Sequence, residues 1–154
     1  MKREPAPPSS ARLERYRKLI AEFERATCAA AAVPPSVAAF CAAAGISERT
    51  LLRAVRAVHG VSVHRHLQAV RLAQARTMLG SMDAKTTTVT QIAMRCGFLE
   101  LGRFSRLYRN AFGEWPSETL NRTPRACELD RPTSDGRDVG LGLAQSLLRE
   151  REQV

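Results

Sequence analysis

The sequence is poor in aromatic side chains and contains no long apolar run. Aromatic residues make up only 5% of the 154 residues, so a core has to be built mainly from Leu, Val, Ile and Ala. That composition suits helices better than sheets, and few stretches alternate apolar and polar residues. The N-terminal segment also lacks the apolar region of a signal peptide. We therefore expect an all-α protein, one domain in length, with no membrane span.

Cysteine is scarce and widely spaced. Cys28, Cys41, Cys96 and Cys127 include no C-x-x-C pair, whereas structural metal sites usually need close ligand pairs. Cys41 and Cys96 fall on apolar helix faces and are expected to be small buried residues. The lack of a signal-peptide region and of a membrane-length apolar run predicts a cytoplasmic chain, in which the thiols are reduced. We expect no metal ion and no other cofactor.

Motifs of known catalytic centres are missing as well. The chain has no G-x-x-x-x-G-K-[ST], no G-x-S-x-G and no H-E-x-x-H pattern. His64 and His66 are two residues apart on a predicted helix and point to different sides, which favours solvated or stacked rings over metal ligation. The sequence does not predict an enzyme.

Positive charge is concentrated in the part of the chain that is predicted to fold. The formal net charge is +9. Residues 36–122 carry twelve Lys and Arg against five Asp and Glu, whereas residues 123–154 carry five against six. A basic folded module favours a polyanion as partner, and nucleic acid is the common one. A solvated basic surface without a partner explains the charge alone equally well.

Apolar residues recur at helical spacing along most of the chain. Residues 1–10 are predicted to be a disordered lead, and residues 123–154 a flexible tail. Seven helices are predicted. The first begins at Ala11 and ends in the alanines before Pro34, and the third begins after a cap at Ser47. The other five cover residues 37–44, 63–79, 89–96, about 104–111 and 117–121. Ser36 and the pair Thr88 and Gln91 have the spacing of N-terminal caps, and residues 80–87 are predicted to form a loop.

The helical pattern contains an internal repeat. Residues 37–46 (VAAFCAAAGI) align with residues 89–98 (VTQIAMRCGF), and after one inserted residue 51–67 align with 104–120. The matches include core positions, turn glycines and two pairs of arginines, Arg53 with Arg106 and Arg56 with Arg109. Chance helical periodicity would reproduce only the core positions.

Each repeat contains a helix with an apolar face opposite an arginine face. The apolar faces comprise Leu51, Val55 and Val58 in the first copy, and Phe104, Leu107, Tyr108 and Ala111 in the second. The basic faces comprise Arg49, Arg53 and Arg56 in the first copy, and Arg106 and Arg109 in the second. A helix that lies in a DNA groove needs such a pair of faces. Ordinary solvated faces are the alternative.

The helix predicted between the copies has two apolar faces. Val63, Leu67 and Val70 lie near one azimuth, and Leu72, Ala75 and Leu79 lie about 150° away. Each face can pack on a different half, so the helix should be a rigid spacer. The predicted domain spans 11–122, with helix-turn-helix units at 36–60 and 88–113 and a linker helix at 62–80.

Two segments, GISERTLLRAVRAVHGVSVHRHL and QIAMRCGFLELGRFSRLYRNAFGEWPSETL, resemble the double helix-turn-helix DNA-binding domain of the AraC/XylS family of bacterial transcription regulators. The resemblance covers roughly residues 11–122. It implies seven helices, arranged as two homeodomain-like three-helix subdomains joined by a linker helix. It also implies recognition helices in successive major grooves, about one helical turn or roughly 34 Å apart.

The resemblance implies two sets of DNA contacts. Base contacts fall on Arg49, Leu52 and Arg53 in the first recognition helix and on Leu101, Gly102, Arg103, Ser105 and Arg106 in the second. Leu101 and Gly102 depart from the polar residues often found there, so the second helix should read fewer bases or touch a thymine methyl group. Phosphate contacts are expected from Thr50, Arg56, Arg65, Arg95 and Arg109.

The function implied is a sequence-specific regulator, more often an activator, that binds double-stranded DNA beside a promoter and recruits RNA polymerase. Many members of the family add a ligand-sensing or dimerisation domain, and here only the lead and one helix precede the DNA-binding part. A stand-alone regulator and a fragment of a larger effector-sensing regulator therefore both remain open, and the effector is unknown. A protein-interaction module, with basic faces that meet an acidic protein, is the rival interpretation.

Overall fold

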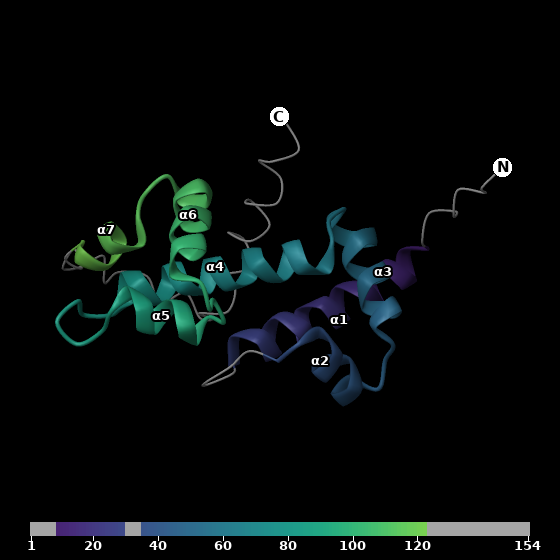
Figure 1. The fold of residues 1–154 in the computed structure, drawn as a ribbon. Coiled ribbons are helices and arrows are strands. Elements are labelled where there is room, and N and C mark those ends of the chain that lie inside the picture. The colour runs from purple at the N-terminus through teal and green to yellow at the C-terminus, as the bar shows by residue number, and fades with distance from the viewer. Residues whose placement is uncertain (1–8, 30–34, 123–154) are drawn as a thin grey trace, which may run out of the picture.

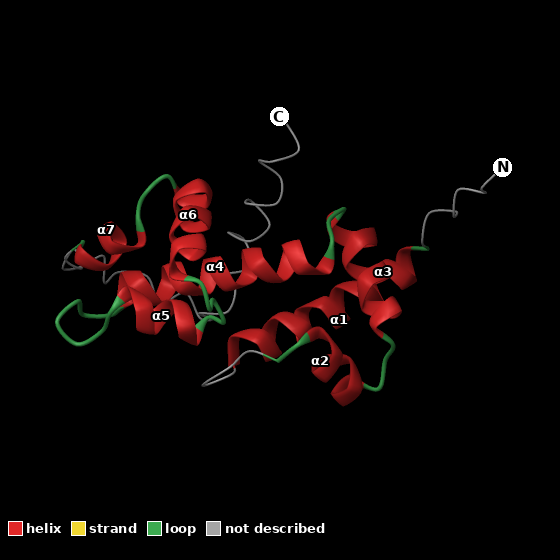
Figure 2. Cartoon of the chain, in the orientation of Figure 1, coloured by secondary structure: helices red, strands yellow, loops and turns green. Residues whose placement is uncertain are grey.

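The computed structural model describes residues 9–29 and 35–122, and within them every regular element is a helix (Figures 1 and 2). The helices are α1 (Ser10–Ala29), α2 (Val37–Ala44), α3 (Glu48–His59), α4 (Val63–Ser81), α5 (Val89–Arg95), α6 (Leu101–Phe112) and α7 (Pro116–Asn121). The all-α, seven-helix prediction is confirmed. The flexible tail at 123–154 lies outside the described residues, as does the predicted lead apart from Ser9 and Ser10.

Helix starts follow the predicted side-chain caps. The hydroxyl of Ser36 accepts a hydrogen bond from the backbone N–H of Ala39 at 3.1 Å. At the start of α5 the Gln91 backbone N–H donates to the Thr88 hydroxyl at 3.2 Å, and the Thr88 backbone N–H donates to the Gln91 side chain at 2.9 Å. This reciprocal box satisfies two N–H groups that a helix start otherwise leaves unpaired.

The end of α4 differs from the prediction by two residues. Gly80 and Ser81 are helical, although the sequence placed them in a loop. Leu79 is 1% exposed and anchors the last turn in the core. The backbone N–H of Met82 donates to the carbonyl of Met78. Helical hydrogen bonding therefore continues past Gly80, although glycine has a low helix propensity.

The turn glycines that the internal alignment pairs also share a backbone conformation. Gly45 and Gly97, which follow α2 and α5, have φ of 65° and 80°. Gly60 and Gly113, which follow α3 and α6, have φ of 74° and 75°. A residue with a Cβ atom rarely adopts such left-handed values. The repeat is therefore a repeat of chain geometry as well as of sequence.

Helix α4 belongs to two separate hydrophobic cores. Its residues Val63, Leu67 and Val70 pack in the first core, together with Phe23 of α1 and Leu51 of α3. Its residues Leu72, Ala75 and Leu79 pack in the second core, together with Ile92 of α5 and Phe104 and Tyr108 of α6. The two-faced linker helix is confirmed. Figure 1 shows α4 running from the α1–α3 unit to the α5–α7 unit, with α3 near one end and α6 near the other.

Two further predictions concern cysteine and histidine. Cys41 and Cys96 are 3% and 0% exposed, so both are buried as predicted. His64 is exposed whereas His66 is fully buried. The ring of His66 stacks on that of His59, with ring centroids 4.6 Å apart. Of the two interpretations offered for His66, the stacked ring is therefore correct and the solvated ring is wrong.

Candidate nucleic-acid interface

Helix α3 presents its arginines because most of its opposite face is buried. Leu51, Ala54 and Val55 are 0% exposed and fix the rotation of the helix against α1 and α4. The residues predicted to contact bases from α3 are all exposed; they are Arg49, Leu52 and Arg53. Leu52 is 43% exposed, which makes it one of the exposed large apolar side chains of the described residues.

Helix α6 has the same arrangement in the second repeat. Phe104 and Tyr108 are 0% exposed, and the Tyr108 hydroxyl is 2.9 Å from the hydroxyl of Thr119 in α7. Burial raises the pKa of the Tyr108 hydroxyl, which keeps this inward group neutral. Of the predicted base contacts on α6, Ser105 is half-buried and the others are exposed; these are Leu101, Gly102, Arg103 and Arg106.

Eight exposed arginines of α3, α4, α5 and α6 include those of the two basic faces. Within residues 9–29 and 35–122, none of them forms an ion pair with a carboxylate; they are Arg49, Arg53, Arg56, Arg65, Arg95, Arg103, Arg106 and Arg109. By contrast, Arg76 and Arg122 both pair with Glu114. Unpaired guanidinium groups on one molecule add to a positive surface potential, and each can donate to a phosphate or a base.

The residues predicted to contact phosphate lie around these faces. Thr50 is half-buried, with its hydroxyl 2.9 Å from that of Ser47. The other four are exposed and come from four helices; they are Arg56, Arg65, Arg95 and Arg109. The guanidinium carbon of Arg109 lies 4.5 Å from the centroid of the Trp115 ring, a cation–π contact that holds the arginine in place.

Helices α3 and α6 differ at their first turns. At α3 the Ser47 hydroxyl caps the backbone N–H of Thr50 at 3.2 Å. At α6 the cap position is Glu100, and no side chain accepts from the first turn. The N–H groups at the start of α6 are therefore free to donate to an anion such as a phosphate oxygen.

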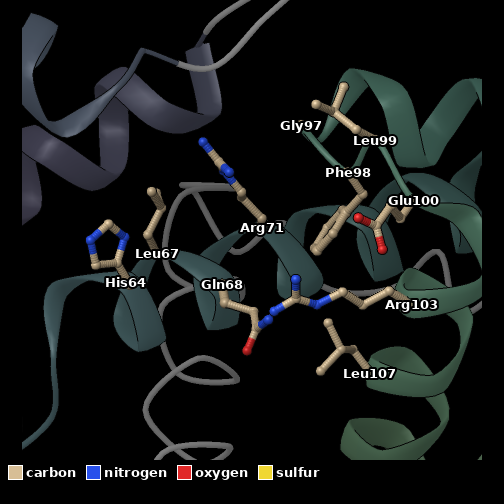
Figure 3. Close-up of a pocket in the computed structure, with 10 residues that line it drawn as sticks. All are labelled: His64, Leu67, Gln68, Arg71, Gly97, Phe98, Leu99, Glu100, Arg103 and Leu107. Carbon is tan, nitrogen blue, oxygen red and sulfur yellow. The ribbon is translucent and has the colours of Figure 1, made fainter.

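A cleft of about 310 Å³ separates α4 from the segment that leads into α6 (Figure 3). Arg71 and Gln68 line it from α4, and Leu99 and Arg103 line it from the second unit. In Figure 3 the Arg103 side chain extends toward Gln68. Burial lowers the pKa of Arg71, whose Nε atom is buried without a hydrogen-bond partner. The cleft thus brings two arginines, Arg71 and Arg103, together with the carboxylate of Glu100.

Sequence reasoning did not single out Leu99 or Arg71. Leu99 is 91% exposed, directly before the second recognition helix. An apolar side chain so exposed beside unpaired arginines suits contact with a thymine methyl group. The only signal in the sequence was its place between Phe98 and Glu100, outside the apolar period of either helix.

The geometry defines a tandem helix-turn-helix domain, and comparison with known proteins agrees. Residues 40–122 match the family described as a helix-turn-helix domain. The chain is 38% identical over 91 residues to the probable thc operon regulatory protein of Rhodococcus erythropolis, covering 59% of this chain and 27% of that protein. It is 36% identical over 77 residues to the XylDLEGF operon transcriptional activator of Pseudomonas putida, and the match covers 50% of this chain and 24% of that protein.

Solved structures resemble the chain as well. A probable AraC family transcriptional regulator from Rhodopseudomonas palustris shares 38% identity, covering 68% of this chain and 96% of that one, with a TM-score of 0.57. A regulator from Chromobacterium violaceum, described as containing an AraC-type DNA-binding domain, has a TM-score of 0.60 at 23% identity. The match covers 77% of this chain and 100% of that one. At this low identity, the similarity to the Chromobacterium structure shows a shared fold and no more.

The chain therefore belongs to the AraC/XylS family and carries its DNA-binding domain. It spans about a quarter of the length of the two regulators from Rhodococcus and Pseudomonas. Among the helices of the described residues, none combines the length and the apolar character that a membrane span needs.

Proposed function

We propose that this chain is a sequence-specific regulator that inserts α3 and α6 into successive major grooves on one side of a DNA duplex. The proposal depends mainly on one observation. Two equivalent helices present arginine faces that form no ion pair within residues 9–29 and 35–122, and a single helix, α4, is packed in the core of both units. A spacer fixed at both ends favours simultaneous binding, because one unit then holds the other near its own site.

We assign the roles of the residues from the resemblance to the family. Base contacts come from Arg49, Leu52 and Arg53 of α3 and from Leu101, Gly102, Arg103, Ser105 and Arg106 of α6. Leu99 adds an apolar contact at the start of α6. Phosphate contacts come from Thr50, Arg56, Arg65, Arg95 and Arg109, with the free N–H groups of α6 beside them. The unit that carries these contacts is the domain spanning residues 11–122.

The regulatory outcome is proposed by analogy. The Pseudomonas putida relative is named a transcriptional activator, and we extend activation to this chain, with recruitment of RNA polymerase to the promoter beside the bound site. The site of action is then the bacterial cytoplasm, where the DNA lies. Regulation by an effector would require a sensing domain of the kind that many family members carry.

Selection of binding sites from random duplex DNA, followed by footprinting, tests the proposal. The expected site is asymmetric, because both helices come from one chain. It should cover about two helical turns, with its two halves roughly 34 Å apart between centres. Footprints confined to a single turn would show that only one unit reads DNA. Failure to enrich any sequence, together with capture of an acidic protein, would favour the interaction module.

A further inference from the structure

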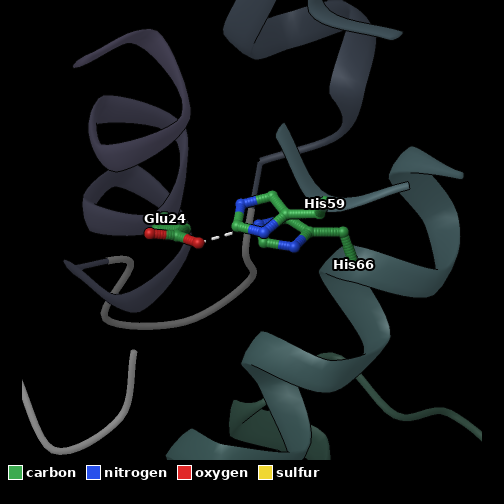
Figure 4. A group of neighbouring side chains, drawn as sticks. All are labelled: Glu24, His59 and His66. Atoms are coloured by element: carbon green, nitrogen blue, oxygen red, sulfur yellow. Dashed lines mark ion pairs between the residues drawn. The ribbon is translucent and has the colours of Figure 1, made fainter. Parts of the chain in front are cut away.

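Three side chains that can bind a metal ion meet inside the first unit. Glu24 comes from α1, His59 from the end of α3 and His66 from α4 (Figure 4). One ligand atom from each lies within 4.8 Å of the other two. Glu24 is 5% exposed and His66 is 0% exposed, whereas His59 is half-buried.

The buried members of this cluster have poorly satisfied polar atoms. Nε2 of His66 lies 2.8 Å from Oε1 of Glu24. Neither ring nitrogen of His66, however, forms a hydrogen bond of acceptable geometry with any group in the described residues. The His59 ring stacks on it at an interplanar angle of 17° and offers it no hydrogen bond. A fully buried imidazole with unpartnered nitrogens is unfavourable unless something else binds them.

We propose that Glu24, His59 and His66 form a binding site for a divalent transition-metal ion, with Zn²⁺ the best match. Two imidazole nitrogens and one carboxylate oxygen are ligands that Zn²⁺ favours, with water as the fourth ligand. Mg²⁺ and Ca²⁺ prefer sites made of oxygen ligands alone. The half-buried ring of His59 leaves one side open for the ion to enter.

The charge of the cluster also suits a cation. Glu24 is 5% exposed, and a carboxylate in a mostly buried site favours a cation beside it. Burial and the neighbouring His66 lower the pKa of His59, while Glu24 raises it to a smaller degree. The stacked rings need a modest rotation of His59 to direct both nitrogens at one ion.

An ion at this site would cross-link three helices, α1, α3 and α4. It would tie the last residue of α3 to α1 and α4, and so fix the recognition helix against the spacer. Because Glu24 lies 35 residues before His59, the unfolded chain does not hold all three ligands together. Metal binding should therefore stabilise the folded state selectively.

The test is a titration of the full, reduced chain with Zn²⁺ by calorimetry and with Co²⁺ by visible absorption. The wild type should bind one ion saturably, and its thermal midpoint should rise with Zn²⁺. Glu24→Gln and His59→Ala should each lose at least about tenfold in affinity. His64→Ala, which removes an exposed histidine from the same region of α4, is the matched control and should bind like the wild type.

Three outcomes would overturn the proposal. The first is the absence of saturable binding in the wild type. The second is equal affinity of His59→Ala and His64→Ala, which would mean that the ion binds elsewhere. The third is a thiolate-to-Co²⁺ charge-transfer band that disappears in Cys28→Ala, which would assign the ion to a cysteine site. His59 is half-buried and ends its helix, so its replacement leaves the core packing of α3 intact.

Discussion

At the scale of single residues, Arg53 and Arg106 are the pair that we expect to recognise DNA bases from equivalent positions of the two repeats. They occupy aligned positions of the two repeats, both are exposed, and neither has an ion-pair partner in the described part of the chain. A guanidinium group can donate two hydrogen bonds to O6 and N7 of one guanine. Each arginine is therefore expected to specify one base pair.

Replacing Arg53 or Arg106 by Ala should relax base preference at one position of the site per variant. The expected loss is about 1 to 3 kcal/mol on the preferred base and much less on the other three. Competition binding with singly substituted duplexes measures this. Arg17→Ala is a suitable control, because Arg17 pairs with Glu14 on α1. Equal weakening on every sequence would reassign these side chains to phosphate.

Cys96 is a second residue whose chemistry is set by its surroundings. Its side chain is fully buried in the second core, and burial, reinforced by the nearby Cys28 thiol, raises the pKa of the Cys96 thiol to about 12. Only the thiolate reacts readily with alkylating reagents. The folded protein should therefore protect Cys96 by excluding the reagent and by keeping the thiol protonated.

Alkylation of Cys96 should accordingly stay slow between pH 7 and pH 9 in the folded protein. In urea the thiol ionises near its ordinary pKa of 9.0, so labelling should speed up about tenfold per pH unit over the same range. Mass spectrometry of timed samples gives both rates, and the exposed Cys28 is an internal reference. Labelling of Cys96 as fast as Cys28 in the folded protein would contradict the burial.

At the scale of elements, α4 is the helix on which the arrangement of the two units depends. It contributes Leu67 to the first core and Leu72 to the second, five residues further along. On a helix of 3.6 residues per turn such a step changes the azimuth by about 140°, so the two side chains face different units. Bending or fraying of α4 would change the distance between α3 and α6.

Leu67→Ala and Leu72→Ala should each reduce the free energy of unfolding by about 2 to 5 kcal/mol, because each leaves a cavity in a packed core. Urea denaturation gives the total loss. Hydrogen exchange should locate it in α1 and α3 for Leu67→Ala and in α5 and α6 for Leu72→Ala. His64→Ala on the exposed side should change stability little. A loss below about 0.5 kcal/mol for either leucine would mean that α4 does not pack as described.

At the scale of the whole molecule, we expect the two units together to determine the affinity for DNA. The predicted phosphate contacts come from both units and from α4, and the domain region 36–122 carries an excess of positive charge. Neutralising phosphates releases counterions, so the salt dependence of binding counts the charges that engage DNA at once. This count distinguishes the binding of both units from the binding of one.

Binding to the selected site should have a log–log salt slope near −4.5 for about five neutralised phosphates, which means roughly 500-fold weaker binding at 200 mM than at 50 mM salt. Arg109→Ala should reduce the slope by about 1. Fluorescence anisotropy over a salt series measures both. A slope half as steep would indicate that only one unit engages, and an unchanged slope in Arg109→Ala would remove that residue from the phosphate contacts.

The sequence by itself determined the features that depend on local spacing. The caps at Ser36, Ser47 and Thr88, the paired turn glycines and the two faces of α4 are all confirmed. Helical hydrogen bonds connect residues four apart, and a buried stripe repeats every three or four residues. Their signals are therefore complete within a short segment of chain.

Only the tertiary structure decided which distant side chains meet. Glu24 lies against His66, 42 positions along the chain, and Arg103 reaches into the cleft beside α4. Leu99 is almost fully exposed although it is apolar. Such contacts depend on the angles and the rotation at which helices cross, and these follow from the packing of all the core side chains together. Periodicity along one helix carries no information about that packing.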